Sequence, residues 1–156
     1  MHTDRLKIES DVIARFFQLS NKLQTTLDQE LKKDGLTIKQ FFLMIVIDSF
    51  DHEPGFSEIS ERFGTSRQNV KQLALKLSAH GYVSIETGAQ DARFKRLALT
   101  QKAKAFWDKR DPHDENLLNK IFQAVPTEQL IIFLDTMTKM ETELITMQKE
   151  QKGAHQ

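Results

Sequence analysis

The sequence contains no cysteine among its 156 residues, and it has little proline, glycine, tryptophan or tyrosine. Without cysteine, a disulfide, a thiolate metal site, a catalytic cysteine and a cysteine-based redox switch are all excluded. Three prolines and six glycines are too few for a disordered chain. With 39% hydrophobic and 28% charged residues, the composition predicts one folded, helix-rich domain with a substantial core.

A long apolar run and a signal peptide are also missing. The longest apolar stretch, Phe41 to Ile47, is far shorter than a membrane span, and residues 1–5 lack the basic-then-apolar order of a signal peptide. We therefore expect a cytoplasmic protein with no membrane partner. The five histidines are scattered without ligand spacing, so no metal and no cofactor are expected. No enzyme is expected either, because phosphate loops, nucleophile elbows and paired histidine–carboxylate motifs are absent.

The sequence has no net charge, because 22 basic residues balance 22 acidic ones. Their distribution is uneven. Six basic and two acidic residues occur from Thr65 to Leu97, a net charge of +4, which leaves −4 on the rest of the chain. A basic segment on a neutral protein predicts one surface that attracts phosphates and another that stays in water.

Hydrophobic periodicity predicts two helices before this basic segment. The first covers about 9–33 and ends before Gly35, and the second, capped by Thr37, covers 38–50. Because residues 41–47 are apolar all round, we expect the second helix to be buried on every side.

A helix-turn-helix is predicted next. Ser57 can cap a helix that runs through Phe63. A further helix begins at Thr65 or Ser66, and Thr65 with Gln68 has the spacing of a capping box. The outward face of this helix carries polar and basic side chains: Arg67, Gln68, Lys71, Gln72 and Lys76.

Two strands follow, over 82–87 and 95–99, joined by a loop with a basic tip. The order of elements predicts a winged helix-turn-helix, mainly α with a small β-hairpin wing. A helix after the hairpin is expected to be interrupted at Pro112, and a last helix follows Pro126. Its heptad seam favours a dimer core over a ligand-binding surface: Leu130, Phe133, Met137, Met140, Leu144 and Met147.

Two segments of the sequence resemble the MarR family of transcriptional regulators. Residues 59–70 match the family's helix-turn-helix. Asp91-Ala92-Arg93, followed by 97–103, matches its wing, where an Asp, an Arg two places on and a closing Leu-Thr pair fall in register. The order of the helices also fits, so the resemblance covers roughly residues 9–150.

This resemblance implies a homodimer with intertwined terminal helices, whose two recognition helices and two wings bind a pseudo-palindromic operator in double-stranded DNA. It implies a sequence-specific transcriptional regulator, acting as a repressor that a small aromatic effector releases. Residues 1–36 would then contribute a dimerisation helix, 37–100 the DNA-binding domain and 101–156 the C-terminal dimerisation helices. The alternative function is a winged-helix module that binds another regulator instead of DNA.

Forked amide side chains match the edges of adenine, so Gln68 and Gln72 are candidates for base contacts. Asn69 either contacts DNA or bonds nearby backbone. Ser66 and Arg67 are candidates for phosphate contacts, and so are two lysines that are otherwise ordinary solvated side chains: Lys71 and Lys76.

On the wing, Arg93 is the candidate for the minor groove, where a planar cation is attracted by the enhanced negative potential. Asp91 orients Arg93 or shapes the turn, and Lys95 and Arg96 are candidates for phosphate contacts. Five aromatic residues line either an effector cavity or the plain core: Phe16, Phe41, Phe42, Phe106 and Trp107.

Overall fold

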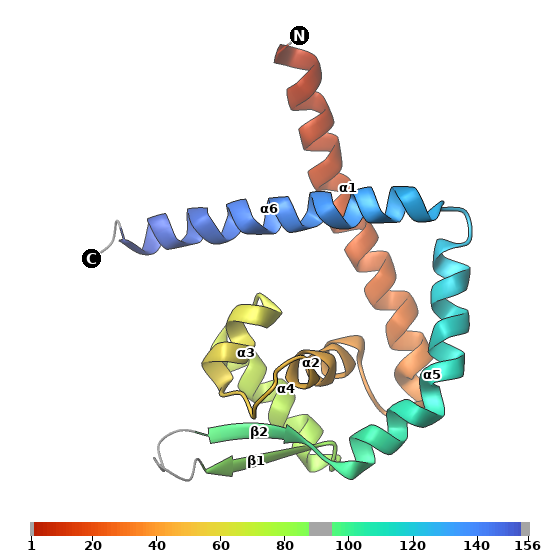
Figure 1. Cartoon of the computed structure of the whole chain (residues 1–156), viewed down its shortest axis with the longest axis vertical. Helices are drawn as coiled ribbons and strands as arrows, with labels where there is room; N and C mark the ends of the chain where they lie inside the picture. The colour runs from red at the N-terminus through yellow and green to blue at the C-terminus, as the bar shows by residue number, and fades with distance from the viewer. Residues whose placement is uncertain (1, 88–94, 154–156) are drawn as a thin grey trace. The chain divides into compact units, whose positions relative to one another are not determined.

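A computed structural model describes residues 2–87 and 95–153 of the chain. Within these residues the chain forms six α-helices, one 3-10 helix and one two-stranded antiparallel sheet (Figure 1). The expected mainly helical fold with a small hairpin is thereby confirmed. The chain divides into two compact units, Met1–Asp108 and Lys109–Gln156.

The first unit begins with α1, His2–Leu31, which continues into the 3-10 helix η1, Lys32–Asp34. The helix starts well before the predicted position, because the first residues contain no glycine or proline and Arg5 pairs with Glu9 one turn later (Nε to Oε1, 2.8 Å). Gly35 follows η1 in the left-handed conformation with φ 70°, as its predicted role in ending the helix requires.

Thr37 caps α2, Ile38–Asp48, as predicted. Its hydroxyl accepts a hydrogen bond from the N–H of Gln40, and the Gln40 side chain accepts one from the N–H of Thr37. The Ile38 N–H donates to Oδ1 of Asp28 over 2.6 Å. This bond fastens the start of α2 to α1.

The expectation that α2 is buried on every side is wrong. Leu43 and Met44 are fully buried, but Phe42 and Ile45 are 47% and 42% exposed. The helix contacts α1, the next two helices and the second strand of the sheet, and these neighbours leave Phe42 and Ile45 only partly covered in the single chain. The apolar stretch 41–47 of α2 therefore keeps two partly exposed side chains.

The next helix, α3, spans Phe56–Phe63 and begins one residue before the predicted cap Ser57. Gly55 is the N-cap residue, and its N–H donates to Oε2 of Glu58 over 2.8 Å. Glu58 thus accepts a hydrogen bond from a free N–H at the helix start. The sequence had predicted Ser57 as the capping residue. Gly64 ends the helix in the left-handed conformation.

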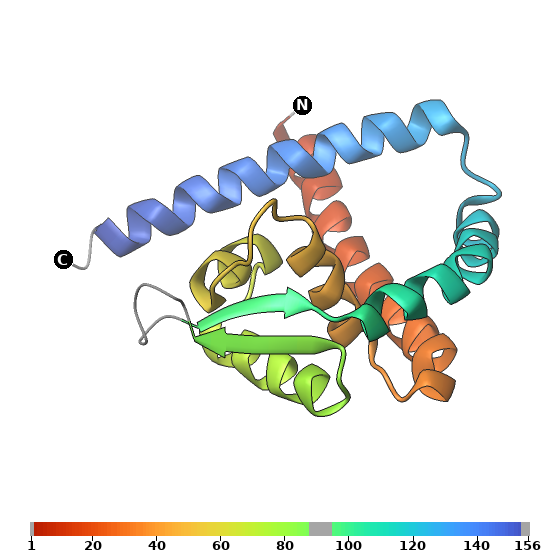
Figure 2. The same ribbon diagram turned by 60° about the horizontal axis from the view of Figure 1, so that its bottom comes forward.

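The hairpin consists of β1, Val83–Thr87, and β2, Lys95–Leu99, with Val83 opposite Leu99 and Thr87 opposite Lys95. It lies beside α4, Arg67–Ala79, and contacts α2 and α3 through β2 (Figure 2). The core between these elements contains large side chains with no exposed surface: Leu43, Met44, Ile59, Val70, Leu77 and Leu97.

The helix α5, Gln101–Phe122, continues through Pro112, where an interruption was expected. Proline removes one backbone hydrogen bond from the helix, and a two-pronged ion pair spans the same turn. Arg110 donates from Nε and Nη2 to the carboxylate of Asp114 over 3.2 and 2.7 Å. The guanidinium is nearly buried, so this bridge stabilises the helix on both sides of the proline.

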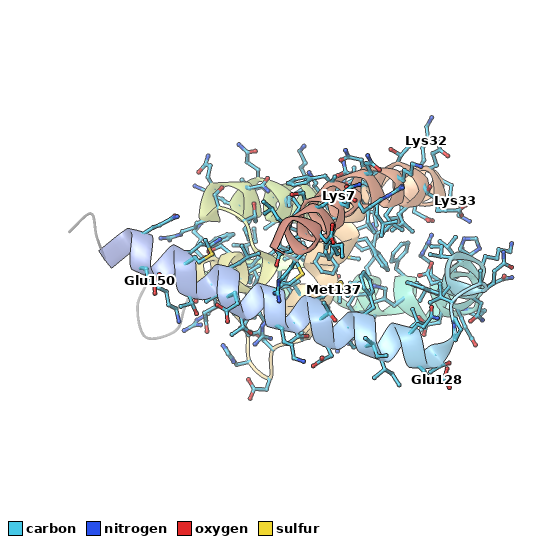
Figure 3. The ribbon with its side chains drawn as sticks, turned by 90° about the horizontal axis from the view of Figure 1, so that it is seen from above. Lys7, Lys32, Lys33, Glu128, Met137 and Glu150 are labelled. Atoms are coloured by element: carbon cyan, nitrogen blue, oxygen red, sulfur yellow. The ribbon has the colours of Figure 1, made fainter. Side chains whose placement is uncertain are left out.

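The last helix, α6, spans Thr127–Gly153, and Figure 3 shows Glu128 and Glu150 toward its two ends with Met137 between them. Within the seam, Met137 and Met140 are half-buried, whereas Leu144 and Met147 are exposed. Ile131, Ile132 and Leu134 on the same helix are also exposed. Among the described residues, no helix is both long and apolar enough to span a membrane.

Candidate nucleic-acid interface

The helix α4 is capped by Ser66, whose hydroxyl accepts a hydrogen bond from the N–H of Asn69. Of the two predicted starting residues Ser66 is the correct one, and the predicted capping box between Thr65 and Gln68 does not form. Thr65 instead accepts a hydrogen bond from the Asn69 side chain over 3.0 Å. Asn69 is half-buried by this contact, so its amide supports the turn between the two helices.

Replacing Ser66 by alanine is expected to destabilise the protein by about 1 kcal/mol, because the N–H of Asn69 loses its acceptor. Chemical denaturation followed by circular dichroism measures this change. Ser57→Ala is the matched control, since the Ser57 side chain is exposed and does not cap α3. Equal losses in the two variants would contradict the assignment of the cap.

The two faces of α4 differ sharply. Val70, Ala74 and Leu77 are fully buried. All five side chains expected on the outward face are exposed: Arg67, Gln68, Lys71, Gln72 and Lys76. Gly81, with φ 76°, follows the helix and lets the chain turn into the hairpin.

A groove with a volume of about 750 Å³ lies between the start of α3, the first two turns of α4 and β2. It brings together five of the predicted DNA-binding residues, from two segments of the chain: Arg67, Gln68, Lys71, Lys95 and Arg96. Glu58 also lines the groove, so four basic residues and one acidic residue give it a net charge of +3. Such a surface attracts phosphates.

The carboxylate of Glu58 connects three segments at the edge of this groove. It accepts hydrogen bonds from the N–H of Gly55 (2.8 Å), from Nε2 of His52 (2.9 Å) and from Nη1 of Arg96 (3.1 Å). Arg96 also donates to the carbonyl oxygen of Glu53 over 3.2 Å. These contacts hold β2, and with it the base of the wing, against the start of α3.

These contacts shift the acidity of the groups involved. The N–H of Gly55 and the ring of His52 lower the pKa of the Glu58 carboxyl, with a further contribution from the charge of Arg96. Hydrogen bonds to Asp51 and Glu58 raise the pKa of His52 from its ordinary value of 6.5. Both shifts favour the charged forms.

The remaining site predictions have separate outcomes. Gln72 and Lys76 are exposed on α4 but do not line the groove. Asp91 and Arg93 lie outside the described residues. Sequence reasoning missed the part of the groove formed by Gly55, Phe56, Ser57 and Glu58. The spacing of Gly55 and Glu58 was a local signal for the cap. No local signal connects Glu58 with Arg96, which lies 38 positions later.

The five aromatic candidates for an effector site differ in their burial and in their ring contacts. Phe41 and Phe106 meet edge to face, with ring centroids 6.3 Å apart, and both pack against the core with Trp107. Phe42 instead pairs with Phe63. Phe16 is half-buried on α1. The described residues contain no group of three histidines, aspartates or glutamates placed to hold a metal ion.

Two helices joined by a short turn and followed by a hairpin, with a basic groove along the second helix, define a winged helix-turn-helix protein. Solved structures show which winged helix-turn-helix proteins the chain resembles. A MarR protein from Peptoclostridium difficile matches 86% of this chain and 87% of its own with a TM-score of 0.76 and 18% identity. MepR of S. aureus, in complex with DNA, matches 84% and 96% with a TM-score of 0.72 and 17% identity. The chain has the fold of MarR-family regulators, as the sequence resemblance implied.

Relatives are found among characterised proteins as well. The transcriptional repressor MprA of Escherichia coli K12 is 28% identical over 112 residues, which cover 71% of this chain and 64% of MprA. The transcriptional activatory protein BadR of Rhodopseudomonas palustris is 21% identical over 106 residues, which cover 67% of this chain and 61% of BadR. The chain therefore matches somewhat less than two thirds of the length of these relatives. No family model matches the sequence.

Proposed function

We propose that this chain is a DNA-binding transcriptional regulator that reads a pseudo-palindromic operator as a homodimer. The observation that carries the proposal is the groove in which Arg67, Gln68 and Lys71 of α4 meet Lys95 and Arg96 of the wing strand. Cations from two elements form one phosphate-attracting surface on a chain of zero net charge. The structure of MepR with DNA and the regulatory roles in the names of MprA and BadR support this function.

Within the proposed interface the residues divide by chemistry. Arg67, Lys71 and Lys95 bind phosphates and position the protein, as does Ser66 at the start of α4. Gln68, exposed at the start of the recognition helix, reads an adenine through its paired donor and acceptor. The proposal extends to Arg93 as the wing residue in the minor groove.

The homodimer and the effector belong to the same proposal. The dimer is supported by exposed apolar side chains on the terminal helices, among them Ile131, Leu134 and Leu144 of α6. The effector is supported by two apolar side chains of α2 that stay partly exposed, Phe42 and Ile45. Repression is the direction we propose, and an aromatic effector would relieve it.

Selection of bound sites from random duplexes tests the function. Analytical ultracentrifugation measures the mass of the protein in solution, which is compared with the 18.1 kDa of one chain. We expect an enriched palindrome, a mass of two chains and binding that weakens steeply with salt. Placing the site upstream of a reporter gives the direction of regulation, and salicylate serves as a phenolic probe of release. A protein that enriches no site is instead a winged-helix interaction module.

Replacing Gln68 by alanine is expected to weaken binding to the selected site by about 1–3 kcal/mol and to relax the preference at one base pair of each half-site. The loss arises because the adenine edge is left without its partner. Fluorescence anisotropy with the selected duplex and its single-base variants measures both effects. Gln24→Ala, which removes an exposed amide on α1, provides the control and leaves the affinity unchanged.

A further inference from the structure

The ring of His52 lies between two carboxylates at the edge of the basic groove. Its Nδ1 is 2.8 Å from Oδ1 of Asp51, and its Nε2 is 2.9 Å from Oε1 of Glu58. An ionised carboxylate only accepts hydrogen bonds, whereas a neutral imidazole has a single N–H to donate. Both contacts therefore require the doubly protonated ring, and a neutral ring loses one of them.

Further charged groups surround this pair. Arg96 of β2 shares the Glu58 carboxylate with His52, at the opposite oxygen. Arg62 of α3 adds a favourable charge to Asp51. The other charged residues nearby belong to the loop, the groove wall of α4 and the wing strand: Glu53, Arg67, Lys71 and Lys95. A proton on His52 thus raises by one the net charge at the edge of a groove that carries +3.

We propose that His52 is a positioning residue of the DNA interface, which acts through Glu58 on Arg96 and makes DNA affinity depend on pH. When protonated, His52 neutralises part of the charge of Glu58, which weakens the ion pair of Glu58 with Arg96 (3.1 Å) and lowers the free-energy cost of turning Arg96 toward a DNA phosphate. When His52 is neutral, Glu58 retains its full charge and holds Arg96 back. This inference rests on the proposed DNA-binding function, which it deepens by naming a regulation of the same groove.

The direction of the pH effect follows from the contacts. The hydrogen bonds to Asp51 and Glu58 raise the pKa of His52, so the imidazolium stabilises the fold below the ordinary value of 6.5 and this contribution is lost as the pH rises through the raised pKa. DNA phosphates raise the pKa of His52 further, because they favour the charged ring. By linkage, DNA binding takes up protons, and affinity falls as the pH rises through the same range.

One unit charge about 7 Å from a phosphate, screened by water, changes an affinity about threefold. We therefore expect the wild-type protein to bind the selected duplex about threefold more tightly at about pH 5.5 than at about pH 8.5. His52→Gln keeps a donor for Glu58 without titrating, and its affinity stays at the weaker level. His52→Arg carries a permanent charge and stays at the tighter level. If His52 only supported the fold, the two variants would not show pH-independent DNA affinities at two different levels.

Fluorescence anisotropy across the pH range, at constant ionic strength, measures these profiles, and His80→Gln is the matched control, since His80 is an exposed histidine at the end of α4. This control keeps the wild-type profile. A pH dependence that survives His52→Gln overturns the inference, as does a flat wild-type profile with intact DNA binding.

A histidine titration by NMR on the DNA-free protein separates this inference from the proposed function. The pKa of His52 is expected to fall toward its ordinary value in Glu58→Gln, where the charged acceptor of Nε2 is gone. An unchanged pKa in that variant overturns the pairing itself. If the pairing is found but no duplex is bound at any pH, the proposed function fails, and the role of His52 at a DNA interface fails with it.

Discussion

Reversal of charge at Arg67 and Lys71 together is expected to weaken DNA binding by at least about 100-fold, because two phosphate contacts per chain are replaced by repulsion. Both side chains line the groove from the first two turns of α4. The variant Arg67→Glu/Lys71→Glu is therefore also expected to have a shallower dependence of affinity on salt, by about 0.9 for each lost contact. Gel-shift titrations at several salt concentrations measure both quantities.

The matched control is Lys22→Glu/Lys33→Glu, which changes the net charge by the same amount. These two lysines are exposed on α1 and η1 and do not line the groove. This variant is expected to lose far less affinity, since charges outside the interface act only through screened, long-range repulsion. Equal losses in the two variants would show that net charge alone determines binding, and that the groove is not the DNA interface.

Replacing Leu77 by alanine is expected to lower the free energy of unfolding by about 2–5 kcal/mol. Leu77 is fully buried on the inner face of α4, where it packs into the core between α2 and the hairpin. Truncation removes apolar contacts and leaves a cavity that rigid neighbours do not fill. Urea denaturation at a fixed protein concentration measures the loss, since the stability of a dimer depends on concentration.

Leu75→Ala supplies the comparison on the same helix. Leu75 is 53% exposed, so its truncation is expected to change the stability by less than about 0.5 kcal/mol. The two variants share helix propensity and size change and differ in burial. Comparable losses of stability in the two variants would mean that α4 packs with a different face against the core.

The course of the chain through the helix-turn-helix could be predicted because its signals are local. Helical periodicity over α4 separated the buried residues Val70, Ala74 and Leu77 from the exposed ones. Glycine at position 35 marked the end of the first helix through its access to positive φ. The choice of cap was harder, because Thr65 and Ser66 are adjacent and both can cap a helix; in the structure Ser66 has the extended backbone of a cap.

Features that depend on distant contacts could not be predicted. Arg96 was expected to be available to phosphates, but Glu58, 38 residues earlier, already binds its guanidinium. The spacing of the histidines gave no role to His52, and its position between two carboxylates follows from the fold of the loop before α3. Phe42 is 47% exposed although it lies in the apolar stretch 41–47, because burial depends on how many neighbours the chain supplies. The contact of Arg93 with the minor groove remains a prediction from sequence.

The hydrogen bond from Ile38 to Asp28 anchors α1 near its C-terminal end. Beside that bond, Leu31 and Leu36 are buried in the hydrophobic core, whereas the side chains from Asp4 to Arg15 are exposed. Thirty helical residues form a rod about 45 Å long. A tilt of about 5° at its anchored end moves the other end by about 4 Å on that length. A small rotation of α1 against α2 at this bond therefore displaces the first turns of α1 by several times more than the anchored end.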